Sequence, residues 1–137
     1  MVTLKPVASA RVVSGDARYV QDIECGAHRL RSDEPTFRGG TDAGPAPYDL
    51  LLAALGSCTS ITLRMYADRK GWELGRIEVD LRFIKTSDEE RIERTVRVSG
   101  ALTDEQRARL AEICEKTPVT KTIRAGTPIH TQLAAAP

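Results

Sequence analysis

The amino-acid sequence predicts an α+β domain, because strand patterns stand on both sides of a long helix pattern. The first third of the chain alternates hydrophobic and polar residues in short runs, which is typical of strands. Residues 48–70 repeat hydrophobic residues at helical spacing, and residues 77–98 alternate again. With a second, shorter helix and a C-terminal strand, these patterns predict the order βββ-α-ββ-α-β.

Three strands are expected in the first third of the chain. Residues 3–13 and 18–25 are rich in Val, Thr, Tyr and Ile, and the turn residues 14–16 separate them. A short third strand is expected over residues 28–30. Residues 32–47 contain Asp, Glu, Gly, Thr and three prolines. We expect them to form a long surface loop with little structure of its own, a kind of segment that is often functional.

The helix pattern over residues 48–70 is the strongest in the chain and predicts about six turns. Its first half, residues 48–56, carries apolar side chains on every side, and a helix of that kind is buried all round. A chain of 137 residues has few layers with which to surround a helix completely. We therefore expect a homodimer in which a second copy supplies the missing wall.

The rest of the chain predicts a hairpin, a helix and a short strand. Residues 77–98 alternate in two runs joined by a polar connection, which favours an antiparallel hairpin. Thr103 followed by Gln106 forms a capping box, so a helix begins there and ends before Pro118. One or two short strands are expected within residues 120–133.

Length and charge narrow the classes of function. A chain of 137 residues is about one domain, so residues 1–137 are expected to form a single domain. Twenty Lys and Arg against nineteen Asp and Glu are scattered along the chain, which argues against a nucleic-acid partner. The longest apolar run, residues 50–55, is shorter than the ~18 residues of a membrane-spanning helix. The N-terminus has no apolar run long enough for a signal-peptide core, so we expect a cytoplasmic protein without a membrane partner.

The cysteines and histidines are the side chains best suited to catalysis or metal binding. Cys25, Cys58 and Cys114 fit neither a disulfide framework nor a paired Cys-x-x-Cys metal site. His28 and His130 have no ligand spacing, so no metal or cofactor is expected. Cys58 is a candidate nucleophile because its Ser and Thr neighbours can donate to a thiolate, and core packing is the alternative. The same two interpretations apply to Cys114, whereas Cys25 is expected to pack in the core.

One segment resembles a known family. Residues 40–59 read GTDAGPAPYDLLLAALGSCT. They resemble the OsmC/Ohr family, particularly the OsmC-like branch with the pattern GPxPYELLLAALGxCTxxTLRMYAxRKGW. The similarity runs almost unbroken over residues 33–72, and the later order of elements fits to about Leu133. The resemblance implies an OsmC-like fold, an intertwined α+β homodimer whose long central helices cross in the core.

The resemblance also implies a thiol peroxidase of oxidative-stress defence. In the family, a peroxidatic cysteine attacks the O–O bond of an organic hydroperoxide, releases an alcohol and becomes a sulfenic acid. A second cysteine traps the sulfenic acid as a disulfide, and a dithiol such as dihydrolipoamide reduces that disulfide. An arginine beside the sulfur, oriented by a carboxylate, holds the thiolate.

The resemblance assigns these roles by position. Cys58 matches the peroxidatic cysteine. The arginine matches best at Arg38, twenty residues before Cys58, with Arg18 as the runner-up. The position of the orienting carboxylate holds Tyr48, and Asp49 stands next to it.

The position of the resolving cysteine differs from the family pattern. Relatives often end the second helix with Cys-Pro-Val-His, where this chain has Thr-Pro-Val-Thr at residues 117–120. Cys114 substitutes if the helix brings its sulfur within disulfide reach. Otherwise the chain is a one-cysteine peroxidase that needs an external thiol, or it has lost the activity. The alternative functions are a non-catalytic dimer that binds a small hydrophobic ligand and a thiol redox sensor with a disulfide between Cys58 and Cys114.

Overall fold

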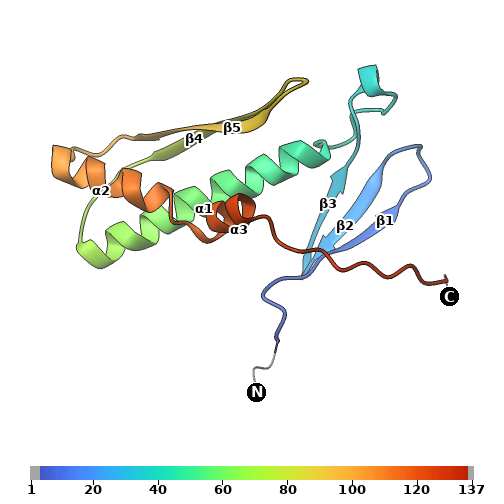
Figure 1. Ribbon diagram of the computed structural model, residues 1–137, viewed down its shortest axis with the longest axis horizontal. Helices are drawn as coiled ribbons and strands as arrows, with labels where there is room; N and C mark the ends of the chain where they lie inside the picture. The colour runs from blue at the N-terminus through green and yellow to red at the C-terminus, as the bar shows by residue number, and fades with distance from the viewer. Residues whose placement is uncertain (1–3, 136–137) are drawn as a thin grey trace. The chain divides into compact units, whose positions relative to one another are not determined.

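The computed structural model describes residues 4–135. Contacts divide the chain into two compact units, Met1–Leu51 and Leu52–Pro137. Figure 1 colours the chain along its length. The elements in chain order are β1 (Arg11–Ser14), β2 (Gln21–Cys25), β3 (His28–Ser32), the 3-10 helix η1 (Thr36–Arg38), α1 (Pro47–Lys70), β4 (Ile77–Lys85), β5 (Glu90–Val98), α2 (Asp104–Cys114) and α3 (Pro118–Ala125).

The first unit contains a three-stranded antiparallel sheet in the order β1-β2-β3. Its register places Val12 opposite Ile23 and Ile23 opposite Leu30, so these three side chains share one face. The three predicted strands are present, but the first one is shorter than predicted, because residues 4–10 form no strand. Pro6 lies in that part and has no N–H with which to join a ladder.

The loop between β3 and α1 is organised around a buried carboxylate. Asp33 is only 2% exposed and accepts hydrogen bonds from the backbone of Glu34, Thr41 and Ala43 at 2.8 to 3.0 Å and from the Thr41 hydroxyl at 2.7 Å. These bonds, with the Ala43 N–H first, lower the pKa of Asp33 to about 2. The expectation that this loop has little structure of its own is therefore wrong: one carboxylate satisfies backbone donors spread along it.

Two glycines of the same loop allow the backbone to fold tightly. A Cβ atom on Gly40 would lie 1.9 Å from the carbonyl oxygen of Glu34, and one on Gly44 would lie 2.3 Å from that of Arg31. Both distances are far shorter than a contact between non-bonded atoms, and both neighbours are backbone atoms. Only glycine fits at these two positions of the segment that resembles the family.

The second unit packs the β4–β5 hairpin and α2 against α1 (Figure 1). Its core cluster contains five buried residues from α1, the following loop and α2. Near the middle of α1, Gly56 lies against the hairpin, since an added Cβ would meet Leu81 at 2.8 Å. The long helix and the antiparallel hairpin are as predicted from the sequence. The core residues are Leu63, Ala67, Leu74, Leu110 and Cys114.

The predicted capping box opens α2 as expected. The Gln106 N–H donates to the Thr103 hydroxyl at 3.1 Å, and the Thr103 N–H donates to the Gln106 side chain at 2.9 Å. This reciprocal pair satisfies two of the backbone donors that a helix N-terminus leaves free.

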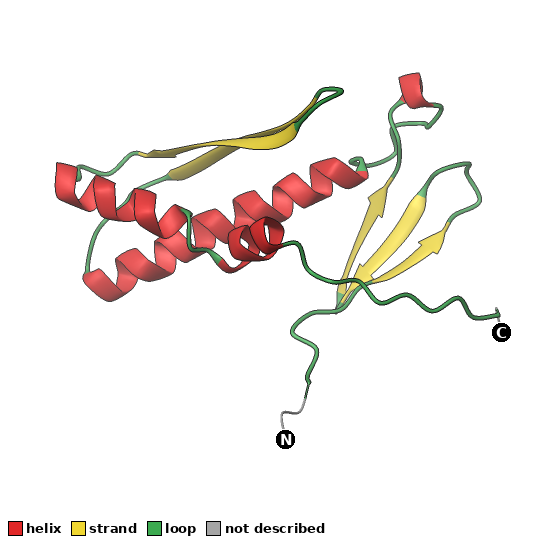
Figure 2. Cartoon of the chain, viewed as in Figure 1, coloured by secondary structure: helices red, strands yellow, loops and turns green. Residues whose placement is uncertain are grey.

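The predicted C-terminal strand is wrong. The chain forms the helix α3 instead, and residues 126–135 are coil (Figure 2), so the order is βββ-α-ββ-α-α. The β-branched residues near position 120 favour a strand, but Thr117 and Pro118 outweigh them. Thr117 is the N-cap of α3, and Pro118 stands at its start, where proline has the right φ and needs no N–H. Pro118 therefore separates α2 from a further helix.

Helix α1 is buried on one face only. Its buried residues are Leu55, Gly56, Thr59, Leu63 and Ala67, whereas Ile61 and Met65 are 51% and 61% exposed. By length and composition alone α1 is apolar enough to cross a membrane. Its buried face, however, packs against the rest of the second unit, as the core helix of a globular domain does. The first half of α1 is not buried all round within one chain, and its cover by a second copy stays a prediction.

Candidate functional site

Cys58 lies near the middle of α1 and is half-buried. Its Sγ lies 3.9 Å from the hydroxyl of Thr62, one turn further along the helix. A hydroxyl that donates to sulfur favours the thiolate form. Among the apolar side chains on this side of the helix, three exposed ones of the same unit stand four residues before Cys58 and three and seven residues after it. Together with Cys58 they form a stripe, the Cys58 stripe, whose apolar members are Ala54, Ile61 and Met65, all exposed.

The two candidate arginines lie in the other unit. Arg38 ends η1, and its guanidinium carbon lies 5.5 Å from the centre of the Phe37 ring. Arg18 lies 4.9 Å from the ring centre of Tyr19. Both arginines are exposed. Since Cys58 belongs to the Leu52–Pro137 unit, a role for either arginine beside its sulfur stays a prediction.

Tyr48 and Asp49 lie in the first turn of α1. The Ala46 N–H donates to the Asp49 carboxylate at 3.0 Å. A carboxylate at this place satisfies a free donor and interacts favourably with the positive end of the helix dipole. Asp49 therefore has a structural task at the start of α1, and Tyr48 is exposed beside it. Their role in orienting an arginine stays a prediction.

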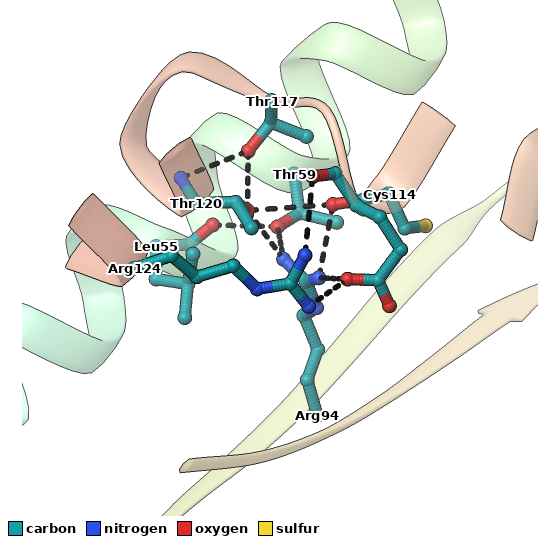
Figure 3. Close-up of polar contacts among 8 residues, drawn as sticks. Leu55, Thr59, Arg94, Cys114, Thr117, Thr120 and Arg124 are labelled. Atoms are coloured by element: carbon teal, nitrogen blue, oxygen red, sulfur yellow. Dashed lines mark hydrogen bonds and ion pairs between the residues drawn. The ribbon is translucent and has the colours of Figure 1, made fainter. Parts of the chain in front are cut away.

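Cys114 is the last residue of α2, and its side chain and its backbone carbonyl have different surroundings. Its side chain belongs to the core cluster and is 9% exposed in all. Burial raises the pKa of the Cys114 thiol, against the opposing effect of the Arg94 cation. Figure 3 shows the sulfur pointing away from the hydrogen bonds that its carbonyl oxygen accepts. Cys114 is therefore a core thiol with an anchored backbone.

Thr117, at the position where relatives often have the resolving cysteine, is fully buried. Its hydroxyl accepts the Thr120 N–H at 3.3 Å and pairs with the Thr120 hydroxyl at 2.6 Å. The position thus holds a helix cap whose oxygen is also part of a larger polar cluster.

Arg94, which is not among the residues predicted from the sequence, is the centre of that cluster. Its guanidinium donates to the hydroxyls of Thr59 and Thr120 and to the Cys114 carbonyl, each at 2.9 Å. It also lies 3.6 Å from the carboxylate of Glu115, which pairs in turn with Arg124. The Arg94 side chain is only 12% exposed. Arg94 therefore ties β5 to α1, to the end of α2 and to α3 (Figure 3).

A signal for Arg94 exists in the sequence. Arg94 alternates with Ile92, Val96 and Val98, which places a guanidinium on the apolar face of β5. A buried arginine must be paired and hydrogen-bonded. An arginine that alternates in phase with the hydrophobic residues of a strand therefore predicts a hydrogen-bonded polar cluster at that position.

The hydrogen bonds of the Arg94 cluster form one consistent set of donors and acceptors. The Thr59 hydroxyl donates to the Leu55 carbonyl at 2.7 Å and accepts from Arg94. The Thr120 hydroxyl donates to the Cys114 carbonyl at 3.3 Å and accepts from Arg94. The hydroxyl of Thr117 then donates to that of Thr120, because a hydroxyl has one proton to give. Among the described residues, no buried side-chain nitrogen or oxygen lacks a partner.

The remaining candidates do not form a metal site. Cys25 is half-buried at the end of β2, opposite the exposed His28 of β3. His130 lies in the C-terminal coil. Within residues 4–135 no group of three or more His, Cys, Asp or Glu side chains is placed to hold a metal ion.

The fold and the site define a class of protein: an α+β domain that presents a half-buried cysteine on its longest helix. The chain belongs to the OsmC-like protein family, whose model matches residues 40–132. The matched region includes the motif before Cys58, the hairpin, α2 and α3.

Solved structures are similar to this chain over most of its length, at low sequence identity. An OsmC-like protein from Mycoplasma pneumoniae is 14% identical with a TM-score of 0.77, and the match covers 90% of this chain and 91% of that one. An organic hydroperoxide resistance protein from Legionella pneumophila is 19% identical with a TM-score of 0.65, covering 89% and 92%. An organic hydroperoxide resistance protein from Elizabethkingia anophelis is 17% identical with a TM-score of 0.66, covering 92% and 93%.

These similarities show a shared fold. No protein with a curated description matches this chain in sequence.

Proposed function

We propose that the chain is a thiol-dependent peroxidase that reduces organic hydroperoxides, with Cys58 as the nucleophile. The observation that carries the proposal is the place of Cys58: a half-buried thiol on the central helix, directly after the family motif, with apolar neighbours and a hydroxyl at 3.9 Å. Two similar structures are named organic hydroperoxide resistance proteins, which supports the same substrate class.

The proposed reaction begins with the Cys58 thiolate. The sulfur attacks the terminal oxygen of the hydroperoxide, a new S–O bond forms and the O–O bond breaks. The sulfur is oxidised to a sulfenic acid and the alkoxide leaves as an alcohol after taking a proton. The apolar side chains of the Cys58 stripe favour an organic hydroperoxide over a small polar one, because they lose contact with water when an alkyl group covers them.

The activating cation follows from the family resemblance. Arg38 is the first assignment and Arg18 the second, because an arginine near the sulfur lowers the pKa of a thiol. If Arg38 has this role, Arg38→Met should slow hydroperoxide reduction by about 10-fold or more, whereas Arg18→Met should have a smaller effect. If Arg18→Met slows the reaction more than Arg38→Met does, Arg18 is the activating residue and Arg38 is not.

A homodimer is part of the proposal. The exposed apolar side chains of α1 are the kind of surface that a second copy covers. Ile61→Glu would place a charge in that surface. Sedimentation of the wild-type chain as a dimer and of the variant as a monomer would support the proposal, and a monomeric wild type would contradict it.

The main experiment measures the consumption of cumene hydroperoxide in the presence of excess dithiothreitol. The wild-type chain should turn over, and Cys58→Ser should reduce the rate by at least ~100-fold, since the serine hydroxyl is a far weaker nucleophile. Cys25→Ser is the matched control, with a rate near that of the wild type. Equal rates for wild type and Cys58→Ser would overturn the proposed function.

A dimer that binds a small hydrophobic ligand without catalysis is the second candidate. The exposed apolar members of the Cys58 stripe favour it, because they can line a ligand site without any reaction at the sulfur. The two functions differ at Cys58. A binding protein would hold an alkyl ligand equally well with Cys58→Ser and would consume no hydroperoxide.

A further inference from the structure

We infer that Cys58 acts without a resolving cysteine from its own chain, and that an external low-molecular-weight thiol reduces its sulfenic acid directly. The inference rests on the proposed function of Cys58 and names the reductant class for that site. Three features of the Leu52–Pro137 unit support it: the helix faces of the two cysteines, the anchoring of Cys114, and its burial.

The two cysteines face different sides of α1. Cys114 packs in the core with Leu63 and Ala67 of α1. Successive residues of an α-helix are rotated by about 100°, so the Cys58 position lies about 140° around the helix from Leu63 and about 180° from Ala67. The body of α1 thus stands between the Cys58 side chain and the contacts of Cys114. A disulfide needs Cβ atoms only about 4 Å apart, so α2 would have to move around α1 to form one.

The Arg94 cluster opposes that movement. The Cys114 carbonyl accepts one hydrogen bond from Arg94 at 2.9 Å and another from the Thr120 hydroxyl at 3.3 Å. Arg94 also donates to Thr59, the residue directly after Cys58. The end of α2 is therefore fastened to the same turn of α1 that carries Cys58, with the sulfur of Cys114 on the core side.

The burial of Cys114 adds a chemical reason. A resolving cysteine must attack as a thiolate. The side chain of Cys114 belongs to the apolar core cluster, and burial raises the pKa of its thiol. In this conformation Cys114 is a poor attacking group as well as a badly placed one.

The chemistry of an external thiol balances without a second protein cysteine. The sulfur of a free thiol attacks the Cys58 sulfenic acid, an S–S bond forms, and the sulfenic oxygen leaves as water after taking the proton of the thiol. A second free thiol then attacks the sulfur of the first, the mixed disulfide breaks, and the Cys58 thiol is restored. Two external thiols are oxidised to one disulfide for each hydroperoxide reduced to an alcohol.

The test follows one turnover of the full-length protein. Wild type and Cys114→Ala are treated with one equivalent of cumene hydroperoxide without reductant, in the presence of dimedone, and the peptides are mapped without reduction. We expect dimedone on Cys58 in both proteins and no disulfide. With 2-mercaptoethanol, a monothiol, the turnover of Cys114→Ala should stay within about two-fold of the wild type. Cys25→Ser is the matched control, with the same expected result.

Three outcomes would overturn the inference. The first is a wild-type protein that forms a Cys58–Cys114 disulfide and a Cys114→Ala variant that loses turnover by more than about 10-fold. The second is a disulfide from Cys58 to Cys25 or to a cysteine of another copy. Mapping of the wild type decides these cases even if a variant fails to fold. The third, a wild type that consumes no hydroperoxide, would overturn the proposed function together with the inference, so the two failures are distinguishable.

Discussion

Two charged side chains with many hydrogen bonds, the buried Asp33 in the first unit and the largely buried Arg94 in the second, have partners at different distances along the sequence. Asp33 accepts all its hydrogen bonds from residues 34–43, so it shapes one loop. Arg94 donates to Thr59, Cys114 and Thr120, which lie 35, 20 and 26 residues away. A buried charge with local partners orders a segment, whereas one with distant partners orders the packing of whole elements. Arg94 is a charge with distant partners, and it holds the end of α2 in place with the Cys114 sulfur in the core.

Of the substitutions at Arg94, Asp33 and Thr117, removal of the Arg94 charge should lower the free energy of unfolding the most. Arg94→Met keeps much of the apolar stem but leaves the acceptors of three elements without their donor. We expect a loss of about 3 kcal/mol in the free energy of unfolding, measured by urea denaturation. The alkylation of Cys114 in the native state should also become faster.

Arg97→Met is the control for that variant. Arg97 lies on the same strand, is exposed and pairs with Asp80 across the hairpin, so its removal should cost less than ~1 kcal/mol. Equal losses in the two variants would show that Arg94 does not hold the elements together.

Asp33→Asn should have an intermediate effect that depends on pH. The pKa of Asp33 is lowered from its ordinary value near 4 to about 2, so the unfolded chain binds more protons between these values. The stabilisation from this carboxylate is fully present above about pH 4 and is lost as the pH falls through about 2. Thermal unfolding of wild type and variant should therefore differ at pH 6 and converge toward pH 2.

Asp42→Asn provides the comparison in the same loop. Asp42 is exposed with a φ of 56°, a conformation that asparagine also adopts. At pH 6 this variant should unfold like the wild type. A difference between wild type and Asp33→Asn that is constant from pH 6 to pH 2 would contradict the role of the Asp33 charge.

Thr117→Ala should lower the free energy of unfolding less than Arg94→Met or Asp33→Asn. It removes the N-cap of α3 and the hydroxyl that pairs with Thr120, which should cost about 1 kcal/mol in the free energy of unfolding. Thr117→Ser keeps the capping oxygen and should lose less. A Thr117→Ala variant as stable as wild type would show that Thr117 contributes little to the Arg94 cluster.

Patterns within short stretches of the sequence predict much of the fold. The capping box at Thr103, the hairpin and the long helix all depend on neighbours along the chain, and the structure has all three. The C-terminal strand was predicted wrongly, because the chain forms α3 there, with Thr117 as the N-cap and Pro118 at the start of the helix. A proline that ends one helix also suits the first turn of the next.

The sequence predicts less of the site. The motif predicts Cys58 as the nucleophile, but it says nothing of how Cys58 lies relative to Cys114. That arrangement depends on Arg94, whose partners meet only when α1, α2, α3 and β5 have packed. The role of Asp33 should be easier to predict than that of Arg94, since its partners are local. Composition alone, however, does not distinguish Asp33 from the other acidic residues of the loop.

The most direct test of the account measures the reactivity of each cysteine in the native protein. The reduced chain is treated with iodoacetamide at pH 8, and the alkylation of Cys25, Cys58 and Cys114 is followed by peptide mass spectrometry. The account predicts that Cys58 reacts at least ~100-fold faster than Cys114, which should become reactive only when the protein is unfolded in urea. Alkylation of native Cys114 as fast as that of Cys58 would contradict the account.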